Sequence, residues 1–257
     1  MARTYALVNQ KGGVGKTTTA INLGAYLTQF DQRVLIVDVD PQANATASLG
    51  VAHANLDLSI YDALIADVSP GAIVMKNRKL NLSLLPSSTD LAGAQVEMTQ
   101  LPDRQNLLER VLKDLEDHYD YLLIDCPPSL GLLTLNGLVA ARDGVIIPVQ
   151  CEYLALEGLT QLMETLNRVR ANMYPGLSVR GLLLTMFDAR TNLSRDVVAE
   201  VRRHFPGQVF RSIIPRSVRL AEAPSHGLPI SAYSPDSTGA LAYKGLAKEL
   251  LEGDASK

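Results

Sequence analysis

The sequence predicts an α/β fold in which helices flank both faces of a doubly wound, mostly parallel sheet. Short continuous apolar runs recur along the chain, helical patterns separate them, and a glycine-rich loop follows the first run. Continuous apolar runs, as opposed to strictly alternating ones, are typical of parallel strands that helices cover on both faces. Such a sheet binds its ligand at the carboxyl ends of the strands, where the glycine-rich loop falls.

The apolar runs and the helical patterns between them define the predicted elements. Strands are expected at 5–8, 34–37, 121–124, 145–149, 182–186 and 209–214. Helices are expected at 16–30, 104–117, 133–141, 156–170, 194–204 and 238–251. Ser59 and Ser194 are expected to cap helix N-termini. No linker rich in proline, glycine or serine divides the 257 residues, so we expect residues 1–257 to form a single domain.

The glycine-rich loop joins the first strand to the first helix, an order that is typical of triphosphate-binding sites. Glycines let backbone N–H groups turn toward an anion, and the helix N-terminus adds partial positive charge. Lys16 is expected to reach the β- and γ-phosphates, and the Thr17 hydroxyl is expected to ligate Mg²⁺. The predicted nucleotide-binding residues of this loop are Lys11, Gly12, Gly13, Val14, Gly15, Lys16, Thr17 and Thr18.

Acidic residues follow two further predicted strands. Asp38 and Asp40 end the second strand, and a period of two puts both on one side, at the mouth of the sheet. Beside a γ-phosphate, such an aspartate can orient the attacking water or hold Mg²⁺ through its shell. Asp125 ends the run 121–124, an arrangement in which a buried strand delivers one carboxylate to the magnesium shell. The stiff loop 127–131 is expected to sense the γ-phosphate.

The bulk properties predict a soluble, cytoplasmic enzyme. The net charge is −3, and no apolar stretch approaches the roughly 20 residues that a membrane-spanning helix needs. The first strand begins too early in the chain to leave room for a signal peptide. Cys126 and Cys151 each follow a strand-like run, so buried, reduced thiols are expected in preference to a disulfide or a metal site.

Between Arg168 and Arg219 the charge balance is reversed. This window holds ten arginines against three acidic residues, a balance of +7, and it contains no lysine. Arginine suits bidentate phosphate contacts, and no recognition-helix module is evident, so we expect the window to bind the DNA backbone without reading bases. A solvated surface of mixed charge is the alternative. His226 is expected to have a structural role in a turn.

Three motifs together resemble the deviant Walker-A ATPases: the loop 11–18, the acidic segment 38–42 and the run 125–128. A later segment, 214–227, is similar to the ParA/Soj branch of these proteins, the DNA-partition ATPases. The likeness extends from about residue 5 to about residue 251, which is nearly the whole chain. It implies an ATPase of the P-loop type that uses ATP and Mg²⁺.

The resemblance implies that ATP closes a sandwich homodimer in which an extra loop lysine crosses to the partner's nucleotide. Lys11 matches that lysine, and the glycine that the strict P-loop pattern has one position earlier is Gln10 in this chain. Asp40 is implied to position the hydrolytic water, and slow hydrolysis is expected because no strong general base is evident. The implied catalytic residues are Lys11, Lys16 and Asp40, the implied metal-binding residues are Thr17, Asp40 and Asp125, and Pro215 is an implied nucleotide contact.

The same resemblance implies two partners besides a second copy of the chain. The ATP-bound dimer is expected to bind double-stranded DNA without sequence preference and to lose that affinity steeply with salt. A ParB-type centromere-binding protein is expected to stimulate hydrolysis, and the protein is expected at the nucleoid. The implied DNA-binding residues are Arg190, Arg195, Arg216 and Arg219.

Three other functions share parts of this pattern. A MinD-like membrane-associated positioning ATPase is expected to end in a basic amphipathic helix, which residues 250–257 do not provide. An electron carrier like the nitrogenase iron protein needs cysteines that bridge a cluster between subunits, and Cys126 and Cys151 do not fit that spacing. The third alternative is a biosynthetic ligase or kinase, and no feature of the sequence indicates one.

Overall fold

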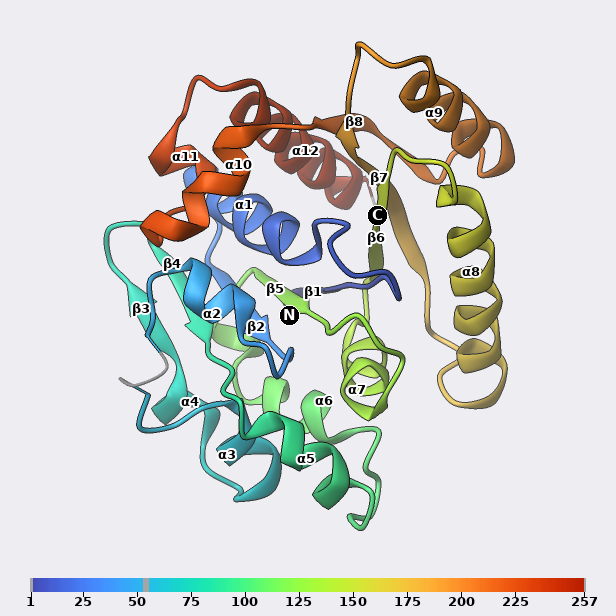
Figure 1. Ribbon diagram of the computed structural model, residues 1–257. Helices are drawn as coiled ribbons and strands as arrows, with labels where there is room; N and C mark the ends of the chain where they lie inside the picture. Colours follow the sequence, from blue (N-terminus) through green and yellow to red (C-terminus); the bar gives the residue numbers. More distant parts are fainter. Residues whose placement is uncertain (1, 53–55, 257) are drawn as a thin grey trace.

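The computed structural model describes residues 2–52 and 56–256, so Met1 and Lys257, the ends of the predicted domain, lie outside these ranges. Within the described residues, eight strands form one sheet in the order β3-β4-β2-β5-β1-β6-β7-β8 (Figure 1). Every neighbouring pair is parallel except β3 and β4. The strands are β1 (Arg3–Leu7), β2 (Val34–Asp38), β3 (Met75–Asn77), β4 (Leu82–Leu85), β5 (Tyr121–Asp125), β6 (Gly144–Gln150), β7 (Val179–Phe187) and β8 (Val209–Pro215). The predicted doubly wound, mostly parallel sheet is confirmed.

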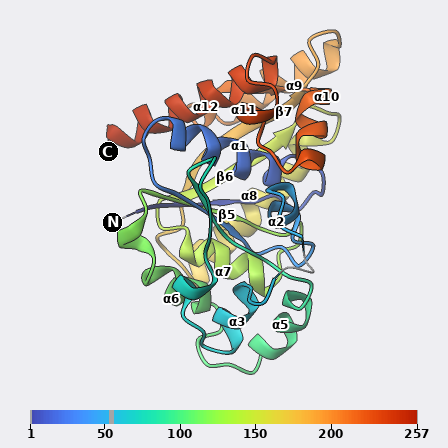
Figure 2. The same cartoon turned by 90° about the vertical axis from the view of Figure 1, so that its left-hand side faces the viewer.

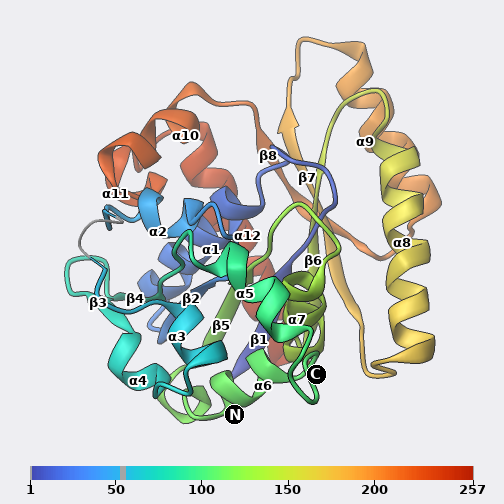
Figure 3. The same ribbon diagram turned by 60° about the horizontal axis from the view of Figure 1, so that its bottom comes forward.

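Helices cover both faces of the sheet (Figures 1 and 2). One face packs against α1 (Lys16–Gln29), α2 (Asn44–Ser48), α10 (Val218–Glu222), α11 (Ile230–Tyr233) and α12 (Thr238–Ala255). The other face packs against α3 (Ile60–Ile65), α4 (Pro70–Ile73), α5 (Leu91–Met98), α6 (Leu107–Lys113), α7 (Leu132–Ala140), α8 (Ala155–Asn172) and α9 (Asn192–His204). Helices α8 and α9 lie side by side over the β6–β8 part of the sheet (Figure 3). The sheet therefore separates two apolar cores.

The predicted strands and helices are all present with shifted ends, and the structure adds β3, β4 and several short helices. The added elements are too short to show a clear hydrophobic period in the sequence. Ser59 caps α3 as predicted, because its hydroxyl oxygen accepts a hydrogen bond from Tyr61 N at 3.3 Å. The prediction for Ser194 is wrong: Thr191 caps α9, and its hydroxyl oxygen accepts from Ser194 N at 3.3 Å.

The predicted motifs meet at the carboxyl ends of the central strands. In the register of the sheet, Asp125 at the end of β5 lies beside both Leu7 at the end of β1 and Asp38 at the end of β2. The chain therefore leaves all three strands at one edge, which we call the carboxyl edge. Figure 2 shows α2 and α10 near this edge, whereas β1 begins and α12 ends at the opposite side of the molecule.

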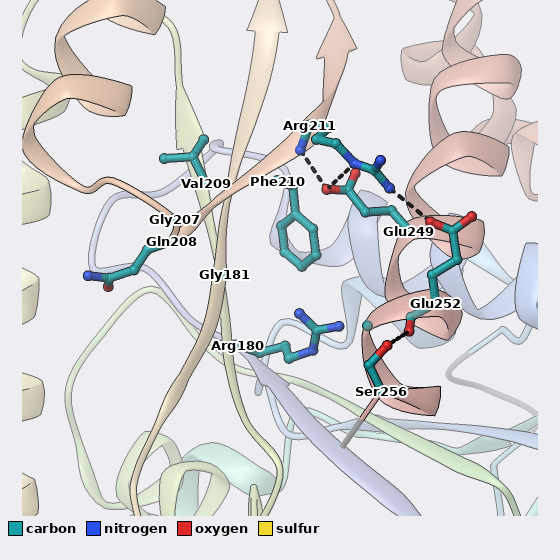
Figure 4. Close-up of a pocket in the computed structure, with 11 residues that line it drawn as sticks. Arg180, Gly181, Gly207, Gln208, Val209, Phe210, Arg211, Glu249, Glu252 and Ser256 are labelled. Atoms are coloured by element: carbon teal, nitrogen blue, oxygen red, sulfur yellow. Dashed lines mark hydrogen bonds and ion pairs between the residues drawn. The ribbon is translucent and has the colours of Figure 1, made fainter.

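A buried ion pair fixes the end of α12 to the opposite edge of the sheet. Asp254 is 7 % exposed and accepts hydrogen bonds from Tyr5 Oη at 2.7 Å, Tyr121 Oη at 3.0 Å and Arg180 Nε at 3.1 Å. Burial raises the pKa of both tyrosines, so both stay neutral donors. The Arg180 guanidinium also lies 5.6 Å from the centroid of the Phe210 ring, at the side of a cavity of about 340 Å³ (Figure 4).

Replacing Asp254 by alanine is expected to lower the free energy of unfolding by about 3–5 kcal/mol, because Arg180 would stay charged, buried and unpaired. Urea denaturation at neutral pH measures this change. Glu252→Ala is the control, since Glu252 lies on the same helix and pairs with the exposed Arg211 at 2.9 Å, where an ion pair contributes little. Equal losses in the two variants would contradict the role assigned to Asp254.

Candidate active site

The glycine-rich loop between β1 and α1 is shaped to hold an anion. Gly13 has a φ of +74° and Gly15 a φ of +94°, a left-handed backbone conformation that other residues rarely adopt. Gly15 is also the N-cap of α1, and no described residue caps this helix through its side chain or places an acid in its first turn. The free N–H groups and the helix dipole therefore favour a bound phosphate.

Neighbouring strands hold the loop in this shape. Asn9 Nδ2 donates to the Pro148 carbonyl oxygen at 2.7 Å, while Asn9 Oδ1 accepts from Lys11 N at 3.0 Å. Thr185 Oγ1 donates to the Val14 carbonyl oxygen at 2.9 Å. Because Pro148 belongs to β6 and Thr185 to β7, the sheet itself positions the phosphate loop.

A cavity of about 310 Å³ beside the loop, which we call the phosphate cavity, brings most of the predicted nucleotide-binding residues together. The predicted residues that line it are Gly12, Gly13, Gly15, Lys16, Thr17, Thr18 and Asp40. The lining also includes Pro128, from the loop expected to sense the γ-phosphate, and three residues outside the prediction, Asn44, Ser48 and Met186. Met186 lies one residue before the end of β7, and that position at the carboxyl edge could have identified it. Asn44 and Ser48 begin and end α2, a helix that the sequence did not predict.

Lys16 is 7 % exposed, and its Nζ donates to the Lys11 carbonyl oxygen at 3.3 Å. Burial lowers the pKa of Lys16, while the negative charges of Asp125 and Asp40 oppose that shift. A triphosphate at the N-terminus of α1 adds further negative charge and favours the ammonium form. Lys16 is therefore placed to compensate phosphate charge in a poorly solvated site.

Thr17 and Asp125 meet behind the phosphate loop. Thr17 Oγ1 donates to Asp125 Oδ2 at 2.7 Å. Asp125 is fully buried, and burial, together with the charge of Asp38, raises its pKa. Its Oδ1 is buried without a hydrogen-bond partner among the described residues. An unpaired buried acceptor is unfavourable, and a hydrated cation beside Thr17 would satisfy it, so the residues present fit Mg²⁺.

The two aspartates after β2 have different surroundings. Asp38 is fully buried; its Oδ2 accepts from Thr46 N at 2.9 Å and from Thr46 Oγ1 at 2.8 Å, and its Oδ1 accepts from Asp40 N at 3.1 Å. Asp40 lines the phosphate cavity, and its Oδ1 accepts from Gln42 N at 2.9 Å. Asp38 therefore builds the loop, and of the two only Asp40 faces the cavity, although both were expected at the mouth of the sheet.

Lys11 and Val14 are the predicted loop residues outside the phosphate cavity as the described residues form it. Val14 is 1 % exposed and contributes its carbonyl oxygen to the anchoring bond from Thr185. The Lys11 side chain is 54 % exposed and forms an ion pair with Glu152, which follows β6. The Lys11 ammonium group therefore lies outside the phosphate cavity that Lys16 lines.

A second cavity, of about 270 Å³, adjoins the first and shares Gly15, Thr18 and Met186 with it. Pro215, the remaining predicted nucleotide contact, lines this cavity together with Leu220 and Tyr243. Its partly apolar walls suit a purine base whose phosphates enter the first cavity. Met186 has a φ of +52°, a strained conformation for a residue with a side chain, and it lies where the two cavities meet.

The four predicted DNA-binding arginines lie at the carboxyl edge, close to these cavities. Arg190 and Arg195 follow β7, and Arg216 and Arg219 follow β8. All four are exposed, and Arg216 also lines the second cavity. The structure therefore places the nucleotide-binding and the DNA-binding candidates on one side of the molecule.

The charged window 168–219, however, does not form one surface. Arg180 and Arg211 lie near the amino ends of β7 and β8, at the opposite edge of the sheet, and both are held in ion pairs. Figure 4 shows Arg211 paired with Glu249 and Glu252. The arginines of this window are close in sequence, but β7 and β8 place some of them at one edge of the sheet and others at the opposite edge. Only part of the +7 charge balance can therefore contribute to one phosphate-binding face.

Cys126 and Cys151 are buried free thiols, as predicted. Burial raises the pKa of Cys151 to about 11 and also raises that of Cys126, so both stay protonated at neutral pH. His226 stacks on Tyr233 with ring centroids 4.8 Å apart, a contact consistent with its expected structural role. Among the described helices, none combines the length and the apolar character needed to cross a membrane.

An anion-binding loop with a buried lysine lies next to the Asp125 carboxylate, one oxygen of which has no hydrogen-bond partner among the described residues, and a phosphate–metal complex would complete both. On a parallel sheet, this combination defines the class of P-loop nucleoside triphosphatases. A family model described as an AAA domain matches residues 2–179.

Two relatives cover nearly the whole chain. The sporulation initiation inhibitor protein Soj of Bacillus subtilis is 50 % identical over 250 residues, which cover 97 % of this chain and 98 % of that protein. The chromosome-partitioning ATPase Soj of Treponema pallidum is 49 % identical over 257 residues, with 100 % of both chains covered. The chain therefore belongs to the Soj/ParA family of partition proteins and is an ATPase.

Solved structures of proteins that are named for other functions share the fold of this chain. Cobyrinic acid a,c-diamide synthase from Mycobacterium smegmatis, with bound ADP and magnesium, is 41 % identical with a TM-score of 0.87, covering 100 % of this chain and 96 % of that one. The cell division ATPase MinD of Pyrococcus furiosus is 27 % identical with a TM-score of 0.79, covering 98 % and 99 %. The fold alone does not separate these functions, so the choice between them depends on the site.

Proposed function

We propose that the chain is an ATP-dependent DNA-partition ATPase in which ATP and Mg²⁺ close a sandwich homodimer. The dimer binds double-stranded DNA without sequence preference at the nucleoid in the cytoplasm, and slow hydrolysis, stimulated by a ParB-type partner, releases it. We also propose that residues 1–257 act as one domain, which the single sheet of the described residues supports. The observation that carries the proposal is the position of Lys11.

One chain places Lys16 in its own phosphate cavity and turns Lys11 out toward Glu152. A second copy that faces the same edge would present its own Lys11 to this nucleotide. Two cations would then neutralise the charge that develops on the oxygen between the β- and γ-phosphates. Gly12 supports a close approach, because an added Cβ would meet nothing within 4 Å in the described chain, so no internal contact requires glycine there.

Within each phosphate cavity, Asp40 is proposed to position the attacking water. It is 5 % exposed, and it is the one acidic side chain among the described residues of the cavity lining. Thr17 and, through a water, Asp125 are proposed to hold Mg²⁺, which when bound stabilises charge on the phosphoryl oxygens. The described lining of the cavity holds no histidine and no acid other than Asp40, and a lone aspartate is a weak base, so slow intrinsic turnover is expected.

The DNA-binding part of the proposal is supported by the arrangement of the arginines. The four candidates lie at the carboxyl edge with Lys11, so a dimer closed across this edge combines both sets of arginines in one assembly. Two weak sites in one assembly bind a polymer more tightly than one site alone, which makes DNA affinity depend on nucleotide.

Two measurements test this function directly. Size-exclusion chromatography with magnesium and a non-cleavable ATP analogue should give a dimer, and filter binding should show DNA retention with that analogue but not with ADP. Liposome flotation in the same conditions tests the MinD-like alternative. A protein that stays a single subunit with the saturating analogue would refute the proposal, and flotation without DNA retention would favour the alternative.

Charge reversal at Arg219 or Arg190 is expected to weaken DNA binding by about tenfold or more at low salt, because each change removes a phosphate contact and adds repulsion. Filter binding across a salt series measures the loss. Arg211→Glu is the matched control, since Arg211 is an exposed arginine at the opposite edge. Retained binding in both Arg190→Glu and Arg219→Glu would remove the proposed DNA face.

A further inference from the structure

Two of the proposed DNA-binding arginines contact carboxylates, and the two contacts differ in kind. We propose that Asp188 is a positioning residue that orients the Arg190 guanidinium toward a backbone phosphate of DNA. This inference rests on the proposed DNA-binding function and adds to it an acidic residue, which a count of positive charges would not select.

Both carboxylate oxygens of Asp188 accept hydrogen bonds from Arg190. Its Oδ1 accepts from Arg190 N at 3.0 Å and from Nε at 2.9 Å, and its Oδ2 accepts from Nη2 at 2.7 Å. Two parallel bonds of this kind fix the plane of the guanidinium. The Arg190 side chain is 86 % exposed while that of Asp188 is 19 % exposed. The carboxylate therefore lies beneath the arginine, and an approaching phosphate meets the guanidinium first.

The backbone that carries Asp188 is itself held in place by α9. Asp188 N donates to Ser194 Oγ at 3.3 Å, and Thr191 Oγ1 donates to the Asp188 carbonyl oxygen at 3.1 Å. Arg195 Nη2 donates to the Ala189 carbonyl oxygen at 2.6 Å. These bonds tie the segment after β7 to the first turn of a helix. Asp188 can therefore hold the Arg190 guanidinium in a fixed direction.

The contribution of the ion pair to folding does not explain a carboxylate at this position. An exposed ion pair contributes little to folding, and a negative charge on a face that binds phosphates opposes that binding. An orienting role does explain the carboxylate. A free arginine loses rotamer freedom when it binds a phosphate, and an arginine that Asp188 already holds loses less. The bonds from Arg190 also hold the pKa of Asp188 well below its usual range, so the pair persists in mildly acidic solution.

Glu222 provides the contrast at Arg219. Its Oε2 accepts from Arg219 Nη1 at 3.0 Å and from Tyr233 Oη at 3.0 Å. Glu222 therefore makes one bond to the Arg219 guanidinium, whereas Asp188 makes two bonds to the Arg190 guanidinium. Glu222 is 40 % exposed beside an Arg219 that is 60 % exposed. A half-exposed carboxylate with one bond competes with a phosphate more than it orients the arginine. Glu222→Gln is therefore the matched control, since it removes the same charge from the same edge.

The test is DNA filter binding by the full chain with magnesium and a non-cleavable ATP analogue. Asp188→Asn is expected to bind DNA about three- to tenfold more weakly although it removes a negative charge, whereas Glu222→Gln is expected to bind equally or more tightly. The slope of log affinity against log salt should stay nearly unchanged in Asp188→Asn, because Arg190 keeps its charge and its phosphate contact, and it should fall by about 1 in Arg190→Ala. In an Arg190→Ala background, Asp188→Asn should cause no further loss, a result that a general structural role would not give.

Arg190→Lys keeps the inference testable if Asp188→Asn does not fold. A lysine keeps the charge but cannot form the two parallel bonds to Asp188, so it should bind DNA more weakly than the wild type but more tightly than Arg190→Ala. Full affinity in Arg190→Lys, or in a folded Asp188→Asn, would overturn the positioning role while leaving the proposed function intact. A wild-type protein that binds no DNA in any nucleotide state would overturn the proposed function, and this inference with it.

Discussion

Lys16→Ala is expected to weaken ATP binding by about 10²–10³-fold, which at ordinary nucleotide concentrations amounts to its loss. Lys16 lines the phosphate cavity and is 7 % exposed, so its charge meets the phosphates with little screening by water. Removing one partner of a buried, hydrogen-bonded charge pair costs about 2–5 kcal/mol, and each 1.4 kcal/mol is a factor of ten. Isothermal titration with ATP and magnesium measures the change.

Thermal unfolding without nucleotide shows whether Lys16→Ala is still folded. Burial lowers the pKa of Lys16, which means that the folded protein stabilises its ammonium group less well than water does. Removing this group is therefore not expected to destabilise the nucleotide-free protein. Near-normal ATP affinity in a folded Lys16→Ala variant would contradict the placement of the triphosphate at the N-terminus of α1.

The sheet and the phosphate loop could be predicted because local sequence determines them. The predicted apolar runs correspond to β1, β2, β5, β6, β7 and β8, and Gly13 and Gly15 are needed for backbone angles that few other residues adopt. Asp40 and Asp125 could be placed near the loop because the carboxyl ends of parallel strands share one edge. These inferences need only the chain order and the rules of parallel sheets.

Other features depend on contacts between distant parts of the chain. Asp254 meets Tyr5 and Arg180 only because α12 packs back across the sheet. Asp38 resembles Asp40 in sequence, but Thr46 captures its carboxylate and removes it from the cavity. Neither the partner of a buried charge nor the direction of a side chain follows from spacing along one strand.

Lys11→Ala is expected to bind ATP with nearly unchanged affinity but to lose about 10²-fold or more of its ATPase activity. The Lys11 side chain lies outside its own phosphate cavity, so one subunit does not need it to bind nucleotide. A cation supplied across an interface that stabilises charge in the transition state contributes about 10³–10⁵-fold in comparable nucleotide hydrolases. Titration and steady-state turnover with DNA present separate the two effects, and unchanged turnover would count against a crossing lysine.

Glu152→Gln is the control for this change, because it frees Lys11 from its ion pair and keeps the ammonium group, so turnover should be retained. Mixing Lys11→Ala with Asp40→Ala then tests whether the lysine acts in the partner's site. In a mixed dimer, the Asp40→Ala subunit still has Lys11, and the Lys11→Ala subunit still has Asp40. If Lys11 crosses, one complete site forms and the mixture hydrolyses ATP although each variant alone does not. If Lys11 acts within its own subunit, no complete site can form and the mixture stays inactive.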